Sequence, residues 1–375
     1  MDRIRGSVLN FNWVTVEFFT QGWDYFFRLE GLTLVILCTL VGVVDYLRGN
    51  ELSCMLTHWA LIVLVRRFMV GGICTSGKRV DGKTVVITGC NVGIGKETAL
   101  ELSRRGAKII MACRDTKKAE KVALEIERET GGEVVVMKLD LASLTSIRTF
   151  AGELKTKEKM IHMLINNAGI MMCPFMKTED GFEMQMGTNH FGHFLLTNLL
   201  LPLLTHSEPA RIITLSSLAH LRGTIPFDDM NYEKGYDRIQ AYGNSKVANV
   251  LFTRHLAKKV KGTNITVFSV HPGAVQSELA RHIGGDILKY FMPFFVKKTA
   301  EGMQTTLYCA LEAEQDDEHY YFRLINGTWL HLAVREFHVA CPDRSSTTSK
   351  PIRRCGRLQW SNDRLQCEGN KHHHK

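Results

Sequence analysis

Between residues 82 and 322, short runs of β-branched and other apolar residues alternate with longer segments of helical pattern. Most of the short runs are continuously apolar, which is typical of parallel strands covered on both faces. Repeated strand–helix units with short turns predict an α/β fold, a doubly wound (Rossmann-type), mostly parallel sheet in a single domain. The predicted strands are 83–88, 108–112, 133–138, 161–165, 211–215, 265–270 and 319–322, and the predicted helices include 94–105, 117–129, 189–205 and 240–261.

The net charge of +9 is concentrated at the carboxyl end of the chain. Residues 323–375 hold ten Lys and Arg residues against four Asp and Glu residues. A basic chain can bind nucleic acid or an anionic surface, but here the basicity belongs to this tail and not to the main domain. We therefore expect no nucleic-acid partner. The tail has no apolar periodicity, so we expect it to lack regular structure.

Residues 1–80 form an aromatic and apolar region that we expect to anchor the chain to a membrane. Residues 31–44 carry no charge and follow a cluster of Phe, Trp and Tyr side chains, which favour the membrane–water interface. A polar break separates two candidate spans, 31–47 and 52–65, so one helix or a hairpin is predicted. The alternative is a buried helix pair packed on the main domain, but residues 31–44 show no polar face.

Charged residues and cysteines indicate where the chain resides. Arg66, Arg67, Lys78 and Arg79 follow the apolar segments and, by the positive-inside tendency, place the main domain in the cytosol. The ten cysteines include no CxxC pair, which favours a reducing compartment and predicts no metal site. Several acidic residues near the start do not fit a mitochondrial transit peptide. We expect the endoplasmic reticulum membrane rather than a mitochondrial membrane.

A glycine-rich segment, Thr88-Gly-Cys-Asn-Val-Gly-Ile-Gly95, follows the first predicted strand and opens a helix. Gly89 permits a tight turn, Gly93 lets the backbone approach a pyrophosphate, and Gly95 lets helix and strand pack closely. The helix N-terminus adds amide donors and a favourable dipole. In this context the segment predicts a dinucleotide site, to which Asn91 and Ile94 also belong.

Arg114 follows the second predicted strand, where a carboxylate would accept hydrogen bonds from a ribose 2′-hydroxyl and indicate NAD. A guanidinium there matches a 2′-phosphate, so NADP(H) is predicted. Asp115 follows at once, and the alternative is that Arg114 is a solvated loop charge. Asp140, after the third strand, is compatible with either an adenine contact or a helix cap near Ser143.

The remaining candidates lie at the predicted carboxyl ends of strands or on helices beside them. Asn166-Asn-Ala-Gly169 follows the fourth strand, where small residues allow close approach to a cofactor and Asn side chains tie strands together. Tyr242 and Lys246 share one helix face, so the ammonium is expected to lower the Tyr pKa for general acid/base work. Ser217 ends the fifth strand, where its hydroxyl can hold a carbonyl oxygen. Asn189 opens a long helix and is otherwise read as a cap.

Taken together, these residues resemble the short-chain dehydrogenase/reductase family over about residues 82–322. A finer resemblance to its retinol dehydrogenases is carried by Thr178-Glu-Asp-Gly-Phe-Glu183, Asn189-His-Phe-Gly-His-Phe194, Ser216-Ser-Leu-Ala-His220 and His271-Pro-Gly273. The resemblance implies a catalytic tetrad of Asn189, Ser217, Tyr242 and Lys246, with Ser216 as the rival serine. The implied cofactor-binding residues are Gly89, Asn91, Gly93, Ile94, Gly95, Arg114, Asp140, Asn167, Ala168, Gly169, Tyr242, Lys246, Pro272 and Gly273.

The resemblance implies a membrane-associated, NADP(H)-dependent oxidoreductase that interconverts a lipophilic alcohol and its aldehyde or ketone, with a retinol- or retinal-like substrate favoured. The alternatives are a steroid or fatty-aldehyde reductase and a non-catalytic, nucleotide-binding membrane scaffold. The expected partners are this substrate and membrane lipid, and a homo-oligomer stays open. Residues 287–296 are expected to form an apolar substrate wall or an ordinary core helix. Gly243-Asn244 is unusual for the family, and the family pattern stops after Phe322.

Overall fold

The computed structural model describes residues 39–44, 47–276, 278–279, 296–314, 319–325, 328–333, 358–361 and 364–367. These residues belong to two compact units. One comprises the chain up to Gly71 together with Gly285–Lys297, and the other comprises Gly72–Gly284 and the chain from Lys298 onward. The predicted apolar wall at 287–296 lies outside the described residues except for Val296.

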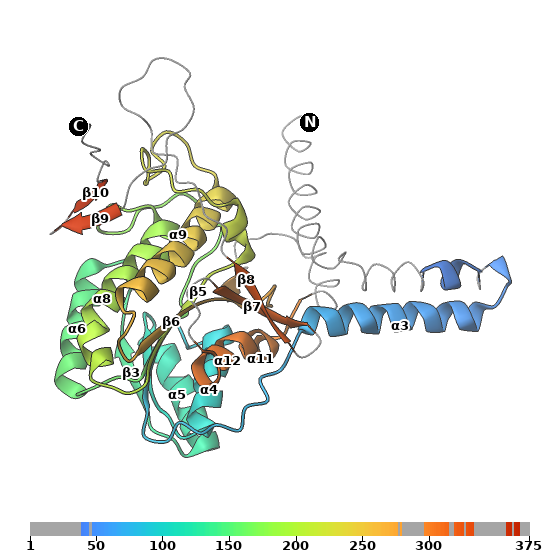
Figure 1. Ribbon diagram of the computed structural model, residues 1–375, viewed down its shortest axis with the longest axis horizontal. Coiled ribbons are helices and arrows are strands. Elements are labelled where there is room, and N and C mark those ends of the chain that lie inside the picture. Colours follow the sequence, from blue (N-terminus) through green and yellow to red (C-terminus); the bar gives the residue numbers. More distant parts are fainter. Residues whose placement is uncertain are drawn as a thin grey trace, which may run out of the picture. The chain divides into compact units, whose positions relative to one another are not determined.

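The larger unit is built from eight strands of one sheet and the helices between them (Figure 1). The strands are β1 (Thr84–Thr88), β2 (Lys108–Cys113), β3 (Val134–Lys138), β4 (Met163–Asn166), β5 (Ala210–Leu215), β6 (Ile265–His271), β7 (His319–Ile325) and β8 (Thr328–Ala333). The helices are α4 (Gly93–Arg104), α5 (Thr116–Thr130), α6 (Leu144–Lys157), α7 (Met184–Met186), the π-helix η1 (Gly187–Phe191), α8 (Gly192–Thr205), the 3₁₀-helix η2 (Leu218–Arg222), α9 (Arg238–Lys259), α11 (Thr299–Gly302) and α12 (Gln304–Leu311).

The sheet has the strand order β3-β2-β1-β4-β5-β6-β7-β8, and all of its pairings are parallel except that of β7 with β8. The chain runs outward in one direction from β1 to β3 and in the other from β4 to β8. This reversal makes a topological switch point between β1 and β4, and ligands of open α/β sheets bind outside the carboxyl ends of the strands at such a point. The prediction of a doubly wound, mostly parallel sheet is confirmed.

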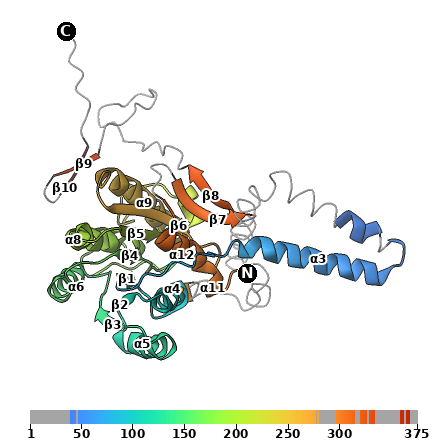
Figure 2. The same cartoon turned by 60° about the horizontal axis from the view of Figure 1, so that its bottom comes forward.

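Helices cover both faces of the sheet, as Figure 2 shows. Residues of α4, α5 and α12 form one apolar cluster with the sheet, and residues of α6, α8 and α9 form the other. β1 serves both clusters, because Val85 and Ile87 point to the first and Val86 to the second. A strand buried on both faces has no polar side to show, which explains why the strand sequences are continuously apolar. All seven predicted strands are present, with ends shifted by at most three residues.

The chain after Phe322 differs from the expectation of a tail without regular structure. β7 continues to Ile325, and β8 pairs with it antiparallel through Ile325 and Thr328. Two further strands, β9 (Leu358–Ser361) and β10 (Arg364–Cys367), pair with each other. The signal for β8 is in the sequence, since Asn326-Gly327 between two strand-like runs is typical of a two-residue hairpin connection. The hairpin was missed at the sequence level because the basic residues 323–375 were treated as one tail.

The smaller unit contains residues 39–44, which are helical, and the helix α3 (Glu51–Val70). The two helical segments lie side by side, because a Cβ placed on Gly42 would lie 3.6 Å from Cε1 of His58. Apolar side chains of α3, among them Met55, Leu56 and Trp59, are more than half exposed. No helix among the described residues is long and apolar enough to cross a membrane. The predicted anchor is therefore unconfirmed, and residues 31–38 of its first candidate span lie outside the described residues.

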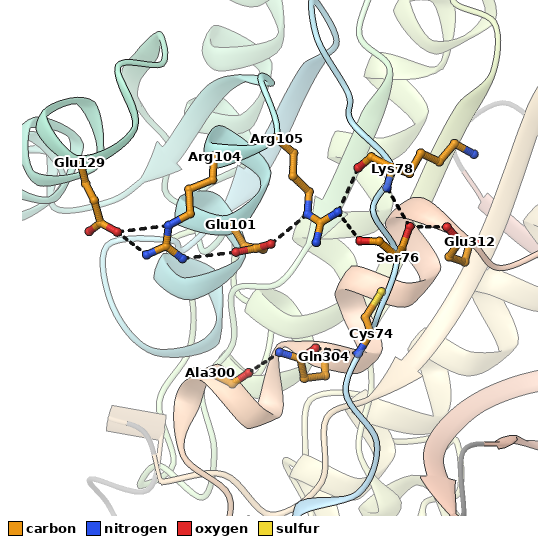
Figure 3. Close-up of polar contacts among 10 residues, drawn as sticks. All are labelled: Cys74, Ser76, Lys78, Glu101, Arg104, Arg105, Glu129, Ala300, Gln304 and Glu312. Carbon is orange, nitrogen blue, oxygen red and sulfur yellow. Dashed lines mark hydrogen bonds and ion pairs between the residues drawn. The ribbon is translucent and has the colours of Figure 1, made fainter.

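The segment that precedes β1 is tied to the larger unit by polar contacts (Figure 3). The Arg105 guanidinium, at the end of α4, donates to the main-chain oxygens of Ser76 and Lys78 at 2.6 and 3.0 Å. The Ser76 hydroxyl bonds Glu312, and the Cys74 amide donates to Gln304 at 2.9 Å. The compact unit thus begins near Gly72, about ten residues before the start expected from the sequence.

Two glycines in helices test how tightly this fold is packed. A Cβ on Gly192, at the start of α8, would lie 2.4 Å from the main-chain oxygen of Leu141, whereas a Cβ on exposed Gly152, inside α6, would meet nothing within 4 Å. We expect Gly192→Ala to lower the free energy of unfolding by about 1–3 kcal/mol because of overpacking. Gly152→Ala, the matched control, should raise it by up to about 1 kcal/mol through helix propensity. Thermal unfolding measures both, and equal shifts in melting temperature would contradict the packing argument.

Candidate active site

The glycine-rich segment turns sharply between β1 and α4. Gly89 and Gly93 have φ values of 61° and 62°, in the left-handed region that favours glycine. A Cβ on Gly95 would lie 2.5 Å from the Asn167 side-chain nitrogen and 2.8 Å from the main-chain oxygen of Gly89, so only glycine fits there without a shift. The N-cap residue Val92 makes no side-chain cap. The first amides of α4 therefore keep donors for an external acceptor.

A cavity of about 580 Å³ adjoins this loop. Loop residues line it together with Lys96 and Lys118, whose ammonium groups form ion pairs with Glu125 and Glu278. Ile94 lies in the first turn of α4. A hollow beside an uncapped helix N-terminus suits phosphate groups, because the free amides donate to them. The residues present thus fit a dinucleotide. The cavity is lined by Asn91, Val92, Gly93, Lys96, Lys118, Val122, Gln276, Glu278 and Thr299.

Arg114 lies immediately after β2, exposed to solvent, and no hydrogen bond or ion pair joins it to another residue in the described ranges. Asp115 is engaged elsewhere: its carboxylate caps α5 by accepting a hydrogen bond from the Lys118 amide at 3.0 Å. Asp115, the acidic residue that left the choice between NAD and NADP(H) open in the sequence, thus caps a helix. This arrangement leaves the guanidinium as the charged group at the end of β2.

Asp140 does not cap α6, because Ser143 occupies the cap position and accepts from the Ser146 amide. The Asp140 carboxylate instead accepts from the Ala142 amide at 2.9 Å within the turn after β3. The helix-cap alternative for Asp140 is therefore wrong. The carboxylate retains acceptor capacity for a ligand, since it uses one of its lone pairs in this contact.

The Asn166–Gly169 segment is held by its asparagines as expected. The Asn166 side chain donates to the hydroxyls of Thr197 and Thr214, which connects β4 with α8 and β5. The Asn167 side chain donates to the main-chain oxygens of Thr88 and Gly89 at 2.8 and 3.1 Å. Ala168 lies so close to Gly89 that a Cβ on Gly89 would be 2.8 Å from the Ala168 Cβ. The Asn167 side chain therefore holds the start of the glycine-rich segment, Gly89–Gly95, in place.

Asn189 lies at the centre of the π-helix η1 and is fully buried. Its side-chain oxygen accepts from the Ile170 amide at 2.8 Å, and its side-chain nitrogen donates to the Ile170 carbonyl and to the Ser245 hydroxyl, both at 2.9 Å. The helix-cap alternative is therefore wrong. These contacts clamp the chain just after Gly169, where a Cβ would lie 3.3 Å from Asn189 and 3.7 Å from the Lys246 nitrogen.

Tyr242 and Lys246 lie on α9 with their functional groups on one face, and the Lys246 nitrogen is 5.5 Å from the centre of the Tyr242 ring. Lys246 donates to the Leu215 carbonyl at 3.2 Å. Burial raises the pKa of Tyr242 to about 12, while a hydrogen bond with Ser217 acts in the opposite direction. Burial also lowers the pKa of Lys246 to about 8. The expectation that Lys246 lowers the Tyr242 pKa is not met here, because desolvation of the phenolate is the larger effect.

The two adjacent serines have different partners. The Ser216 hydroxyl donates to the main-chain oxygen of Lys246 at 2.9 Å and is buried there. Ser217 instead lies within hydrogen-bonding reach of the Tyr242 phenol. The structure therefore brings Asn189, Ser217, Tyr242 and Lys246 to the carboxyl end of the sheet. Pro272 and Gly273 follow β6 at the same edge, with Gly273 at φ 90°.

Three residues that sequence reasoning did not select also shape the site. The Thr88 hydroxyl accepts hydrogen bonds from the amides of Asn167 and Ala168, both at 2.9 Å. Ser245 bonds the Asn189 side chain and donates to the Tyr242 carbonyl. Gly243, noted only as unusual, allows η2 to approach α9, because its Cβ would lie 2.9 Å from the Ala219 oxygen. Only Thr88 had a sequence signal, as the polar end of an apolar strand.

Comparison with known proteins agrees with this geometry. A family model described as short chain dehydrogenase matches residues 83–287. Mouse retinol dehydrogenase 12 is 54% identical over 275 residues, which covers 72% of this chain and 87% of that protein. Human retinol dehydrogenase 11 is 53% identical over 249 residues, covering 66% and 78%. The structure of Pseudomonas aeruginosa RhlG in an active-site complex with NADP has a TM-score of 0.53 and 26% identity, and covers 66% of this chain and 96% of RhlG. The chain therefore belongs to the short-chain dehydrogenase family of oxidoreductases and is similar to its retinol dehydrogenases.

Proposed function

We propose that this oxidoreductase is membrane-associated, prefers NADP(H), and interconverts a retinol-like lipophilic alcohol and its aldehyde. The observation that carries the proposal is the grouping of the Tyr242 phenol with the Ser217 hydroxyl and the Lys246 ammonium at the carboxyl end of the sheet. This group adjoins a loop whose glycines and uncapped helix suit a dinucleotide. A non-catalytic scaffold would not require these buried polar groups to converge beside that loop.

In the reductive direction, the chain's residues handle the oxygen and the proton. When bound, NADPH supplies the hydride for the carbonyl carbon. The Ser217 hydroxyl donates a hydrogen bond to the carbonyl oxygen, and Tyr242 transfers its phenolic proton to that oxygen. The Lys246 ammonium stabilises the resulting phenolate and would hold nicotinamide ribose hydroxyls when the cofactor binds. Asn189 keeps the chain after Gly169 in place and, in this proposal, positions a water that links Lys246 to solvent.

At neutral pH both central groups are in the protonation state that the reductive direction uses. A phenol whose pKa is about 12 is protonated at pH 7 and is ready to act as an acid. An ammonium whose pKa is about 8 is still mainly charged at pH 7 and can stabilise the phenolate that forms. Oxidation of an alcohol begins from the phenolate, which burial disfavours, so it requires more help from Lys246.

Preference for NADP(H) is supported by the charges around β2. The Arg114 guanidinium is exposed at the strand end, and Asp115 is committed to capping α5. Arg114 would hold the 2′-phosphate, and the amides of the Gly89–Gly95 segment would hold the pyrophosphate. Asp140 would face the adenine. Ala168, Gly169, Pro272 and Gly273 would border the nicotinamide half. The complex of the related RhlG with NADP is consistent with this preference.

The substrate class is supported by the relatives, which are named retinol dehydrogenases and share about half of their residues with this chain. A steroid or a fatty aldehyde would be handled by the same tetrad, and no specific contact in the described residues favours either. Membrane association is supported by the exposed apolar side chains of α3. Arg66 near the end of α3 and the basic residues Lys78 and Arg79 support a cytosolic catalytic unit on the endoplasmic reticulum membrane.

The first prediction concerns the nucleotide. Arg114→Ala should raise KM for NADPH by about 10- to 100-fold and leave KM for NADH nearly unchanged, because a charge-assisted phosphate contact contributes about 1.5–3 kcal/mol. Steady-state kinetics with both nucleotides measure this. Arg128→Ala, which removes the same charge from the far end of α5, should change neither value. An equal increase in both KM values for Arg114→Ala would contradict NADP(H) selection by this residue.

The second prediction concerns the acid. Tyr242→Phe keeps the ring and its packing but removes the transferable proton, so turnover should fall by at least ~10²–10⁴-fold while NADPH binding stays near normal. Lys246→Met should lose both turnover and NADPH affinity. NADPH fluorescence titration and turnover of all-trans-retinal in detergent separate the two effects.

Tyr232→Phe is the matched control for Tyr242→Phe. The Tyr232 hydroxyl is also buried, but it accepts a hydrogen bond from Asn244, away from the tetrad. This variant should keep its turnover. A Tyr242→Phe protein as active as the parent would refute the mechanism and restore the scaffold interpretation.

The third prediction concerns the membrane. The full chain should stay in the pellet after alkaline carbonate extraction of membranes, because apolar side chains of α3 and the uncharged run 31–44 would be inserted. A truncated chain should begin at Gly72 and not at Lys78, since Cys74 and Ser76 bond the catalytic unit. That chain should be soluble and fold. Release of the full chain by carbonate alone would contradict insertion.

A further inference from the structure

His193 is a buried polar side chain next to the proposed tetrad with no role in the mechanism described above. It lies in the first turn of α8 and is 1% exposed. Its Nδ1 atom is 2.9 Å from the main-chain oxygen of Asn189, and its Nε2 atom is 3.0 Å from the Thr88 hydroxyl. Both ring nitrogens are therefore used, and each contacts a different part of the site.

The partners of His193 define its tautomer. A main-chain oxygen can only accept, so Nδ1 carries the hydrogen and donates it to Asn189. Nε2 is then an acceptor and takes the hydroxyl hydrogen of Thr88. The Thr88 oxygen remains free to accept from the amides of Asn167 and Ala168, both at 2.9 Å. Burial lowers the pKa of His193 to about 4, so the ring is neutral at physiological pH. Each hydrogen bond in this series therefore has one donor and one acceptor.

Through these contacts, His193 joins three segments that are distant in the sequence. Thr88 ends β1 directly before the glycine-rich turn, and Asn167 and Ala168 follow β4 beneath the cofactor loop. Asn189 clamps Ile170 and reaches Ser245 on α9. One neutral imidazole thus connects the chain after β1 with Asn189, in addition to the hydrogen bonds that Asn189 makes with Ile170.

The backbone of Asn189 lies in a π-helix. In η1 the Gly192 amide bonds the Gly187 oxygen, five residues back, so this turn is wider than an α-helical turn. Its side chain is occupied by Ile170 and Ser245. The main-chain oxygen is the part of Asn189 that His193 holds.

We propose that His193 is a positioning residue that holds the main-chain carbonyl of Asn189 in register with the two cofactor loops. The inference rests on the proposed function, because it assigns His193 a role in the geometry of the same tetrad. It acts through Asn189 and Thr88 and does not touch substrate. Loss of the contact moves Asn189 relative to Lys246 and lowers the rate of the chemical step, while the phosphate-binding loop stays in place.

The test separates the two nitrogens of the ring. His193→Asn retains a donor where Nδ1 lies, so it can still bond the Asn189 oxygen, and His193→Gln retains a polar atom only where Nε2 lies. With full-length protein in detergent and all-trans-retinal, kcat should fall ~10–100-fold for His193→Leu and for His193→Gln. His193→Asn should recover most of kcat. KM for NADPH should change less than about threefold in all three variants.

His162→Leu is the matched control for loss of a buried histidine. His162 lies before β4 at the opposite edge of the sheet and accepts from the Thr84 amide at 3.0 Å. The His162→Leu variant should have a lower melting temperature, but its folded protein should keep the parent kcat. The inference is overturned if His193→Leu lowers kcat no more than His162→Leu does. If His193→Leu does not fold, equal kcat values for His193→Asn and His193→Gln overturn it.

Tyr242→Phe, measured in parallel, tells this inference apart from the proposed function. If Tyr242→Phe is inactive and the His193 variants behave like the parent, only the role of His193 is lost. If Tyr242→Phe retains turnover, the proposed tetrad itself is refuted, and the role of His193 is refuted with it.

Discussion

The close approach of the chain after β1 to the chain after β4 is the constraint on which the rest of the site depends. The Thr88 hydroxyl accepts from two consecutive amides of the Asn167–Ala168 segment, and the Asn167 side chain returns two hydrogen bonds to Thr88 and Gly89. Side chains larger than hydrogen do not fit at Gly89 or Gly95 while these bonds exist. Hydrogen bonds between the turn after β1 and the turn after β4 thus hold the chain together at the switch point of the sheet. The same contacts fix the position of the uncapped start of α4.

Burial has opposite effects on the two central groups of the site. Tyr242 and Lys246 lie one turn apart on α9, and both are almost fully buried. Loss of water disfavours the charged form of each, so the phenol pKa rises to about 12 while the ammonium pKa falls to about 8. The ordinary pKa values of the two groups, 10.0 for the phenol and 10.5 for the ammonium, nearly coincide, so burial moves them apart. The Tyr242 phenol therefore holds its proton more strongly than the Lys246 ammonium does.

Most polar groups in the interior behind this pair bond one another, although the Asn166 Oδ1 atom has no hydrogen-bond partner among the described residues. Asn166, Asn189, His193 and Ser245 each bond another buried group, and these bonds connect β4, η1, α8, α9 and β5. Buried polar networks of this kind specify one arrangement when they are satisfied, because any displacement leaves a donor or an acceptor unpaired. The tetrad owes its geometry to this network as much as to its own side chains.

The sequence by itself determined the sheet, the glycine-rich turn and the pairing of Tyr242 with Lys246, because each depends on residues close together in the chain. Continuously apolar runs identify strands buried on both faces, and i, i+4 spacing places two side chains on one helix face. Only the tertiary structure decided the roles of Ser216, Ser217 and His193, because these depend on partners tens of residues away. The Asp115 and Asp140 carboxylates bond amides two or three residues away, but the sequence left open which of the possible local contacts each would make. The Tyr242 pKa was expected to fall and instead rises, since burial is a property of the packed fold and not of local spacing.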